Sequence, residues 1–499
     1  MRNVLLVALA VLLVVSCTLL GDRDLVQCQQ SSECPTARPQ CIDGLCSAAG
    51  TAGDGGADAD AAAMAADLCP FTYPADATAA LADPNTVRVA AYANLGTTEH
   101  VSPEVATIRY ALDDLAKVTT PQQLVVLFCR KDGPGPDRIN AVLDHLVALH
   151  VPAVFGQLDT SELQTVGAAK GKIAILSTLG NDVALQPQSS GGSPVDWFLL
   201  PELKSLAPAF QKVFDREQAV YATAQDSTKV SVVTDGSPDA TALADVVDQT
   251  IVLGAKKLVD IGERRQRTTV ASAQDVVNFV PDVVIAIGGD AIGNTLIPVI
   301  EASNASRKPA YVLTSRVRYV EGGPFHDALG VHTSKPSLAS RIGGIDYDGS
   351  GTRLVAFGVA TNAISPYVLD FDVLFDAVYA VKLASIRARK SAGARALTAE
   401  DLSEGIRVLA PRADDTPVIL TADGTAQPDF DGAVARADDG APFQLSGISG
   451  VWNINGVTHS RIETDPSYFC IGHDNRILTY IGSPTGLDDF DYCTPINDQ

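Results

Sequence analysis

The chain has 499 residues, with 59 acidic against 37 basic side chains and a formal net charge of -22. Nucleic-acid binding needs clustered lysine and arginine for phosphate contacts, so this balance argues against a nucleic-acid-binding protein. Apolar residues make up 46% of the chain and charged residues 19%, which excludes an acidic disordered protein. The length predicts two or three domains.

The N-terminus has the pattern of an export signal. Arg2 precedes an unbroken apolar run from Val4 to Val15, which has signal-peptide length and is too short to span a bilayer well. The run ends in Val14-Val15-Ser16-Cys17, which resembles a bacterial lipobox, where a signal peptidase cuts before the cysteine and the thiol carries a diacylglycerol. We therefore expect a signal peptide over residues 1–16 and a lipid on Cys17. The alternative is an ordinary signal peptide with an incidental cysteine.

The other eight cysteines are expected to form disulfides. Four of them lie close together among Gln, Ser, Pro and Gly, and their spacing does not match a zinc knuckle. In an exported chain this pattern predicts two disulfides in a small stalk module over residues 17–47, with all three pairings open. Proximity favours Cys470–Cys493, and elimination then leaves Cys69–Cys129. The four clustered cysteines are Cys28, Cys34, Cys41 and Cys46.

A flexible linker is predicted next. Residues 48–68 read AAGTAGDGGADADAAAMAADL, and small residues with Asp and no periodicity are typical of a tether. We assign residues 48–84 to this linker and its lead-in. From about residue 85 the pattern changes to alternating strands and helices.

Short β-branched runs bounded by turn residues predict nine strands. Several are continuous apolar runs, such as LVVLF and DVVIAIG, which are typical of a parallel sheet covered on both faces. The predicted strands are Val87–Tyr92, Leu124–Cys129, Ala153–Gly156, Ile173–Ser177, Trp197–Leu200, Val230–Asp235, Leu258–Ile261, Val283–Gly288 and Tyr311–Thr314.

Helices are predicted between these strands. Apolar residues at helical spacing mark Pro103–Lys117 and Arg138–Leu149. Three helices are expected to open with Ser-Pro, because Ser caps free amides and Pro presets φ in the first turn: Ser102-Pro103, Ser237-Pro238 and Ser365-Pro366. Gly254 is expected to end the second of these helices.

Alternating strands and helices predict an α/β fold with doubly wound sheets and right-handed crossovers. Nine strands are more than we expect in one doubly wound sheet, so we expect two Rossmann-like lobes. Ligands of such sheets sit beyond the carboxyl ends of the strands. This rule selects the candidate site residues below.

The order of elements from about Val87 to Tyr480 resembles the type I periplasmic solute-binding proteins, the leucine/isoleucine/valine-binding family. Each motif alone has low specificity for the family, and the resemblance depends on the order in which the motifs occur along the chain. The stretches that carry the resemblance are LVVLFCRKD with VPAVFGQLDTSELQTVGAAKGKIAILST; DWFLLPELKSLAPAFQKVF; KVSVVTDGSPDATALADVV with VPDVVIAIGGDAIGNTLIPVIEA and KPAYVLTS; and SPYVLDFDVLFDAVYAVKLASI with FQLSGISGVWNINGVTHSR.

The resemblance implies two α/β lobes joined by three crossovers, which close on a ligand in the cleft by hinge bending. It implies a first lobe at residues 85–200 plus 366–415, a second at residues 201–365 plus 440–482, and a C-terminal tail at residues 483–499. Nothing covalent is required, so we expect a non-enzymatic protein with no catalytic residue and no cofactor.

The first lobe offers hydroxyl and amide side chains after its strands. Hydroxyls beside the free amides of a helix start suit a ligand carboxylate, and the resembling family holds that group on the loops after its third and fourth strands. The alternative for Thr160 and Ser161 is that they only cap a helix. The candidates are Thr97 and Thr98 after the first strand, Thr160 and Ser161 after the third, and Ser177, Thr178 and Asn181 after the fourth.

The second lobe offers Asp235, Asp290 and Thr314. Either aspartate is a candidate to pair a ligand cation, and the alternative is that each caps the following helix. The aromatic residues that the family often places here are missing, which puts an aliphatic amino acid ligand in doubt. Tyr92 and Trp197 either line the cleft or pack in the core.

Signals for an enzyme or a metal site are weak. GGDAIGNT superficially resembles the GGDGT loop of NAD and lipid kinases, but Ala291 stands where that loop has glycine. No P-loop, GxSxG, HExxH or SxxK pattern occurs. The seven histidines lack metal-ligand spacing, and IDYDGSG lacks the final glutamate of a calcium loop. We therefore expect no metal and no nucleotide.

Our hypothesis is a lipid-anchored, extracytoplasmic solute-binding protein that captures a small polar solute, such as an amino acid or a related metabolite, for an ABC-type permease or a membrane sensor. Thr18 follows the lipidated cysteine, and without an Asp there an outer-membrane or cell-surface anchor is favoured over retention at the inner membrane. The rival is a cell-surface adaptor that keeps the fold and has lost its ligand. The acidic insert from Ala410 to Pro442 fits that rival.

Overall fold

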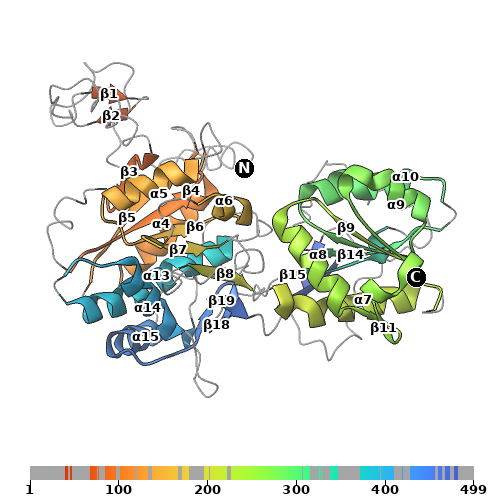
Figure 1. Ribbon diagram of the computed structural model, residues 1–499. Coiled ribbons are helices and arrows are strands. Elements are labelled where there is room, and N and C mark those ends of the chain that lie inside the picture. The colour runs from red at the N-terminus through yellow and green to blue at the C-terminus, as the bar shows by residue number, and fades with distance from the viewer. Residues whose placement is uncertain are drawn as a thin grey trace, which may run out of the picture. The chain divides into compact units, whose positions relative to one another are not determined.

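A computed structural model describes residues 40–42, 45–47, 68–75, 77, 85–96, 102–118, 120, 122–132, 138–166, 171–178, 196–201, 203–221, 226–305, 307–314, 325, 328, 338–346, 371–393, 395–409, 418–419, 428–455, 459–462, 467–471 and 477–480 (Figure 1). Cys17, Cys28, Cys34 and the Ser365-Pro366 helix start lie outside these residues. In the cysteine-rich segment, β1 (Gln40–Ile42) and β2 (Leu45–Ser47) form an antiparallel hairpin in which Cys41 is opposite Cys46.

The first lobe is built on a ten-stranded sheet, and its central strands β4 to β8 are parallel. The order is β16-β17-β18-β19-β8-β7-β6-β4-β5-β3. Its strands are β3 (Phe71–Tyr73), β4 (Val87–Ala93), β5 (Leu124–Arg130), β6 (Ala153–Gly156), β7 (Ala174–Ser177), β8 (Trp197–Pro201), β16 (Val418–Ile419), β17 (Leu445–Gly447), β18 (Gly450–Asn455) and β19 (Ser460–Ile462).

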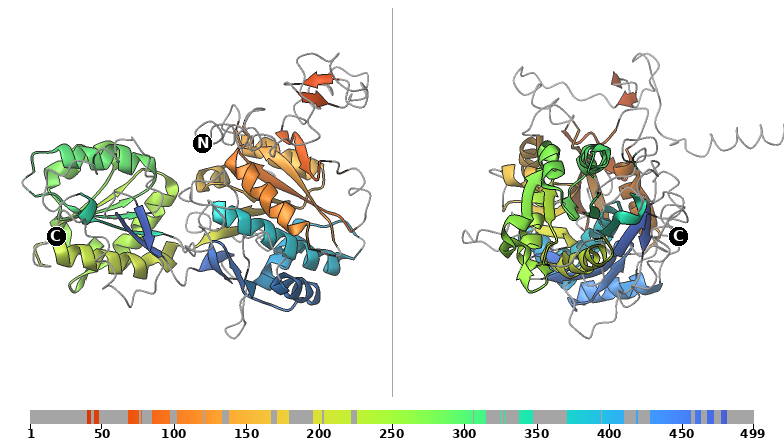
Figure 2. Two further views of the ribbon diagram at one scale, coloured as in Figure 1. Left: turned by 180° about the vertical axis from the view of Figure 1, so that it is seen from behind. Right: turned by 90° about the vertical axis from the view of Figure 1, so that its right-hand side faces the viewer.

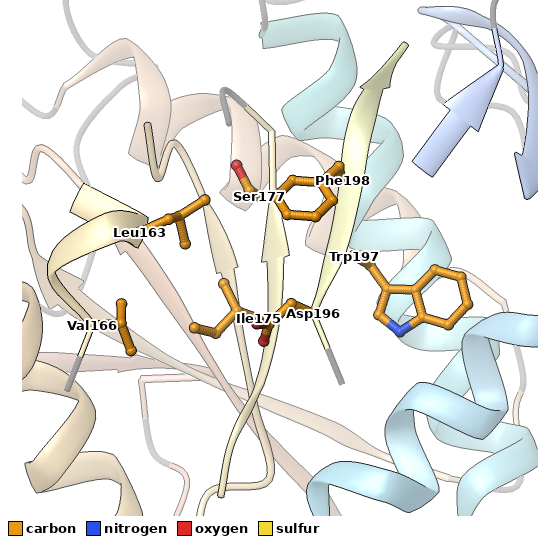
Figure 3. A pocket seen from close by; sticks show the side chains of 7 residues that line it. All are labelled: Leu163, Val166, Ile175, Ser177, Asp196, Trp197 and Phe198. Carbon is orange, nitrogen blue, oxygen red and sulfur yellow. The ribbon is translucent and has the colours of Figure 1, made fainter. Parts of the chain in front are cut away.

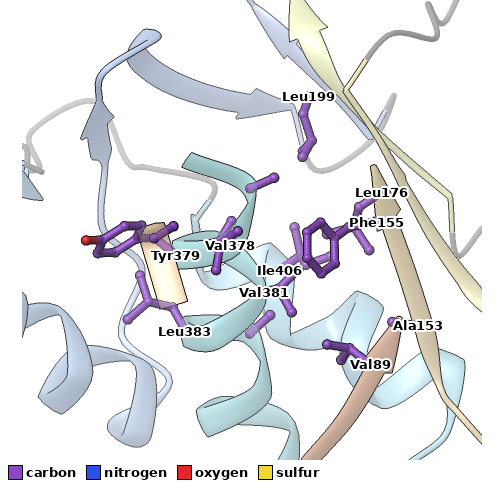
Figure 4. Packing of buried hydrophobic residues seen from close by; sticks show 14 of the residues in the cluster. Val89, Ala153, Phe155, Leu176, Leu199, Val378, Tyr379, Val381, Leu383 and Ile406 are labelled. Atoms are coloured by element: carbon purple, nitrogen blue, oxygen red, sulfur yellow. The ribbon is translucent and has the colours of Figure 1, made fainter. Parts of the chain in front are cut away.

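Helices cover both faces of this sheet (Figure 1). One face packs on α4 (Pro103–Leu115), α13 (Phe371–Ala392), α14 (Ala399–Ile406) and α15 (Pro428–Asp439), and the other packs on α5 (Arg138–Ala148) and α6 (Thr160–Thr165). Figure 4 shows the larger core, where α13 places Val378 and Val381 against Phe155 and Leu176. Burial on both faces explains why these strands read as continuous apolar runs.

The second lobe is built on a seven-stranded sheet of order β12-β9-β13-β14-β15-β20-β21. Helices lie on both sides of this sheet (Figure 2). Helices α7 (Ala207–Tyr221) and α8 (Pro238–Thr250) cover one face, and α9 (Ala273–Phe279) and α10 (Ile297–Ala302) cover the other. Its strands are β9 (Val230–Thr234), β12 (Arg265–Thr269), β13 (Val283–Ile287), β14 (Ala310–Thr314), β15 (Ile342–Asp346), β20 (Ser467–Ile471) and β21 (Ile477–Tyr480).

The two lobes repeat one topology. The parallel strands run β5-β4-β6-β7-β8 in the first lobe and β12-β9-β13-β14-β15 in the second, which is the order 2-1-3-4-5 in both. The chain passes from one sheet to the other after β8, again between β15 and α13, and again between β19 and β20. The predicted pair of Rossmann-like lobes is confirmed.

Three details differ from the sequence prediction. The predicted strand Leu258–Ile261 is wrong, because this stretch forms a 3-10 turn, η4 (Leu258–Asp260), whose Leu258 is buried in the core beside α8. The strand in its place is β12, a polar RQRTT edge strand without an apolar run. Gly254 does not end α8, which stops at Thr250; it forms the turn between β10 (Val252–Leu253) and β11 (Lys256–Lys257).

The lobe boundary near the C-terminus also differs from the expected residue 440. Strands β17, β18 and β19 belong to the ten-stranded sheet, and only β20 and β21 belong to the seven-stranded one. A buried aspartate explains why β17 and β18 belong to the first lobe. The Asp376 carboxylate on α13 accepts hydrogen bonds from the backbone of Ile448 (2.9 Å) and Ser449 (2.9 Å) and from the Ser449 hydroxyl (2.6 Å), which ties the β17–β18 turn to the first lobe.

One predicted disulfide is confirmed. Cys69 and Cys129 are bonded, which ties the lead-in segment to β5 across a separation of 60 residues. Cys470 on β20 is also in a disulfide. Cys493, its predicted partner, lies outside the described residues.

Trp197 and His459 are stacked where β8 and β19 begin. Their ring centroids are 3.9 Å apart and their planes 2° from parallel, and both residues are buried. His459 Nδ1 lies 3.1 Å from the Asp196 carbonyl, which only accepts, so Nδ1 carries the proton and Nε2 faces the Arg407 guanidinium at 3.5 Å. Burial first, and then the Arg407 charge, lower the pKa of His459.

This histidine predicts a loss of stability in acid. The unfolded chain takes up the His459 proton near pH 6.5 and the folded chain only at lower pH, so the free energy of unfolding falls as the pH drops below about 6.5. We expect the free energy of unfolding to fall by about 1 kcal/mol less in His459→Asn than in wild type when the pH is lowered from 7.5 to 5.5. Urea unfolding at the two pH values measures this difference. Asn tolerates the left-handed backbone of residue 459 (φ 58).

His150→Asn is the matched control, because His150 shares the left-handed backbone (φ 54) and is exposed. An equal pH dependence in wild-type protein and His459→Asn would contradict this account of the stack.

Candidate functional site

The candidate site lies at the carboxyl edges of the two parallel sheets. In the order 2-1-3-4-5, the connections from the first and third strands leave in opposite directions, which opens a crevice between their carboxyl ends. In the first lobe this point lies between β4 and β6, and in the second between β9 and β13. Both edges are polar, as the strand-end rule predicts.

Each edge is held by a glycine at the end of the third strand: Gly156 is the last residue of β6, and Gly288 directly follows β13. Gly156 and Gly288 have the same backbone φ of 143°, which L side chains rarely adopt. A Cβ on Gly156 would lie 2.1 Å from the Tyr92 carbonyl oxygen, and one on Gly288 would lie 2.4 Å from Asp235 Cγ. The third strand therefore approaches the end of the first at equivalent positions in both lobes.

A half-buried charge network lies at the crevice edge of the first lobe. Lys131, directly after β5, lies 2.9 Å from Glu162 Oε2 and also donates to the Gln157 carbonyl. The Tyr92 hydroxyl donates to Glu162 Oε1 at 3.2 Å, and burial together with the Glu162 charge raises the pKa of Tyr92. Sequence reasoning missed Lys131 and Glu162; the signal was a charged pair, Lys131-Asp132, directly after an apolar strand.

A buried carboxylate lies beside this network. Glu104, in the first turn of α4, accepts hydrogen bonds from the backbone and side-chain amides of Asn94, the latter at 2.7 Å. Ser102 caps the same helix through Val105 N at 3.2 Å, which confirms the predicted Ser-Pro start. Burial raises the pKa of Glu104.

Helix α6 begins with a capping box. Asp159 Oδ1 accepts from the Glu162 amide at 2.8 Å, and Glu162 Oε2 accepts from the Asp159 amide at 3.0 Å. The Ser161 hydroxyl donates to Asp159 Oδ1 at 2.5 Å, and the Thr160 hydroxyl donates to Asp239 in the first turn of α8. Both predicted hydroxyls therefore donate hydrogen bonds to carboxylates of the chain itself.

The end of β7 carries the other predicted hydroxyls. The Ser177 hydroxyl donates to the Leu158 carbonyl at 2.5 Å. Thr178 is fully buried, and its backbone amide donates to the Gly156 carbonyl at 2.9 Å. Its Oγ1 is buried and makes no hydrogen bond within the described part of the chain. A buried hydroxyl without a hydrogen bond lowers the stability of the folded chain. A bound molecule that formed a hydrogen bond with the Thr178 hydroxyl would therefore stabilise the fold.

A small cavity lies under α6, near these hydroxyls (Figure 3). Its volume of about 20 Å³ is room for one water molecule and not for a solute. Its lining comes from α6, β7 and the start of β8: Leu163, Val166, Ile175, Ser177, Asp196, Trp197 and Phe198. Trp197 and Tyr92 are both buried in packing positions.

Asp235 joins the strand ends of the second lobe. Its Oδ1 accepts from the Ser237 amide at 2.9 Å and its Oδ2 from the Gly289 amide at 2.8 Å. The cap of α8 is Ser237 and not Asp235, which confirms the second Ser-Pro start. The Thr314 hydroxyl donates to the Gly288 carbonyl at 3.2 Å.

Asp290 is exposed beside these groups. The ligand-binding roles of all these residues stay predictions. Thr97, Thr98 and Asn181 lie outside the described residues.

Metal-binding clusters and membrane-spanning helices are absent from the described residues. No group of three or more His, Cys, Asp or Glu side chains there is arranged to hold a metal ion. None of the helices described is long and apolar enough to cross a membrane.

Comparison with known proteins identifies the fold. No profile of a protein family matches the sequence, and no curated protein matches it significantly. Among solved structures, a leucine-binding protein LivK from Thermotoga maritima has a TM-score of 0.51 at 12% identity, over 81% of this chain and 99% of that one. A solute-binding protein of an ABC transporter from R. palustris, in complex with 4-hydroxybenzoate, has a TM-score of 0.52 at 10% identity, over 81% and 100%.

A third structure, the branched-chain amino acid binding protein LivJ from Streptococcus pneumoniae in complex with isoleucine, has a TM-score of 0.50 at 13% identity, over 80% and 100%. The chain has the fold of the type I periplasmic binding proteins, as the resemblance in its sequence implied. At these identities the likeness concerns the fold alone.

The close approach of Gly288 to Asp235 predicts a large substitution effect. We expect Gly288→Ala to lower the free energy of unfolding by about 2–3 kcal/mol more than Gly236→Ala, because the new methyl group overlaps the carboxylate. Gly236 is the control: it also has a positive φ of 91°, but nothing lies within 4 Å of the place that a methyl group on it would take. Urea unfolding measures both variants, and equal losses would contradict the account of this strand junction.

Proposed function

We propose that this chain is a non-enzymatic, extracytoplasmic solute-binding protein, which captures a small polar solute at the carboxyl edges of its parallel sheets. It presents the solute to an ABC-type transporter or a membrane sensor, and a lipid on Cys17 anchors it. The observation that carries the proposal is the repeated 2-1-3-4-5 topology, which gives each lobe a polar edge at the position where doubly wound sheets bind ligands.

The solved structures of similar fold support this proposal. The compounds named with them, isoleucine and 4-hydroxybenzoate, are small molecules, and the proteins belong to transporters. The unsatisfied buried hydroxyl of Thr178 supports it as well, since it stands at the end of β7, beside Gly156. Hinge bending would let a captured solute shift an equilibrium between open and closed forms.

An adaptor without a ligand is the second candidate. The side chains of the first-lobe edge largely satisfy one another, through Lys131 with Glu162 and through Ser161 with Asp159. Such self-satisfaction favours a protein that keeps the fold for a surface interaction.

A thermal-shift panel of amino acids, amino acid amides, aromatic acids, amines and polyols tests solute capture. A solute present at 100 times its Kd stabilises the protein by about 2.7 kcal/mol. We expect at least one class to do so, and we expect Thr178→Val to weaken binding about ten-fold, while Thr178→Ser, which keeps the hydroxyl, binds as wild type. A panel without any stabilising compound would support the adaptor instead.

A further inference from the structure

Two of the three crossings between the sheets leave from one pair of neighbouring strands. The chain enters the second lobe after β8, and it enters that lobe again after β19. These two strands pair in parallel through Ser460 with Phe198 and Arg461 with Pro201, and their register shifts between the two pairs. A rotation of one lobe against the other therefore bends the chain just beyond a short and irregular ladder.

Buried side chains hold the beginning of this strand pair. Trp197 is the first residue of β8 and His459 directly precedes β19, so their stacked rings join the two strands. The Phe198 amide donates to the His459 carbonyl at 2.9 Å. The Trp197 indole N–H donates to the Ser403 hydroxyl on α14, also at 2.9 Å. The stack therefore fixes both crossing strands to each other and to a helix of the first lobe.

The stack requires the neutral form of His459. Its Nδ1–H already donates to the Asp196 carbonyl, so a second proton has to sit on Nε2. Nε2 faces Arg407, whose guanidinium offers only donors and no acceptor. Protonation therefore places a buried cation, with a proton that lacks an acceptor, against a second cation.

Other charged groups on the elements around the stack do not supply the acceptor. Within the described part of the chain, no carboxylate accepts a hydrogen bond from His459. Glu404 on α14 is exposed and binds Arg407 Nη1 at 2.8 Å. Arg461 on β19 and Asp376 on α13 both bind the turn between β17 and β18.

The pKa of His459 reflects these surroundings. Burial lowers this pKa most, the hydrogen bond to the Asp196 carbonyl raises it, and the Arg407 charge lowers it. The net shift is downward, so a ring released from the stack takes up a proton more readily than the stacked ring does. Acid therefore favours release.

We propose that the stack of Trp197 on His459 is an acid-sensitive clamp on the two crossing strands. The clamp holds the beginning of β8 and β19 near neutral pH, and protonation of His459 opens it. The inference rests on the proposed function for its use. Lobes with loosened crossings lose more conformational freedom when they close on a solute, so the protein holds a solute near neutral pH and releases it in acid.

Hydrogen exchange of the whole protein without any solute tests the clamp. The released ring takes up its proton near pH 6.5, so opening becomes up to about ten-fold more frequent between pH 7.5 and 5.5. We expect the amides of β8 and β19, read by mass spectrometry and corrected for the chemical exchange rate, to exchange at least five-fold faster at pH 5.5. This exchange should stay unchanged in 1 M urea, because a local opening exposes little surface.

The variant His459→Asn removes the titrating ring. We expect its corrected exchange rates in β8 and β19 to be equal at the two pH values, whatever their level. His150→Asn is the matched control, because His150 is exposed and has the same left-handed backbone. Its exchange in β8 and β19 should respond to acid as in wild type.

A wild-type protein whose β8 and β19 exchange equally at both pH values overturns the clamp. An acid effect that persists in His459→Asn overturns it too, and so does one that depends on urea, since it then reports global unfolding.

The use of the clamp is tested separately from solute capture. Each compound that stabilises the protein in the thermal-shift panel, and carries no group that titrates between pH 5.5 and 7.5, is measured by isothermal titration calorimetry at both pH values. We expect wild type to bind it at least three-fold more weakly at pH 5.5, and His459→Asn to bind it equally at both. Equal affinities in wild type overturn the release in acid and leave solute capture intact. A panel without any binding compound overturns solute capture, whereas the exchange experiment still decides whether the clamp exists.

Discussion

The close approach of the third strand to the first, at the carboxyl edge of each parallel sheet, is the constraint on which the rest of this structure depends. Gly156 meets the Tyr92 carbonyl in one lobe, and Gly288 meets the Asp235 carboxylate in the other. These contacts fix where the chain leaves each strand. They therefore fix where α6 begins and where Asp235 bridges two loops. The polar edges exist because two strands meet without room for a methyl group.

Much of the fold was predictable because its signals are local. Continuous apolar runs marked β5, β13 and β14, and Ser-Pro pairs marked the starts of α4 and α8. The polar strand β12 was not predictable, because an edge strand buries few apolar side chains and RQRTT shows no such run. Leu258 was misread for the opposite reason: a single 3-10 turn buries it as fully as a strand would.

The candidate site was predictable in position and not in chemistry. The strand-end rule placed Ser161, Thr178 and Asp235 correctly at the sheet edges. It gave no information about their partners, because the bonds from Ser161 to Asp159 and from Asp235 to Gly289 depend on loop geometry. The pairing of Lys131 with Glu162 joins residues 31 positions apart and has no local signature. A polar side chain at a strand end is thus equally a ligand contact or a structural brace until its partners are known.

Native mass spectrometry of the purified protein tests solute capture most directly. The account predicts a population heavier than the bare chain by the mass of one small molecule, present as purified or after incubation with the solute panel, and lost when the protein is unfolded. A spectrum that shows only the mass of the chain under every one of these conditions would contradict it.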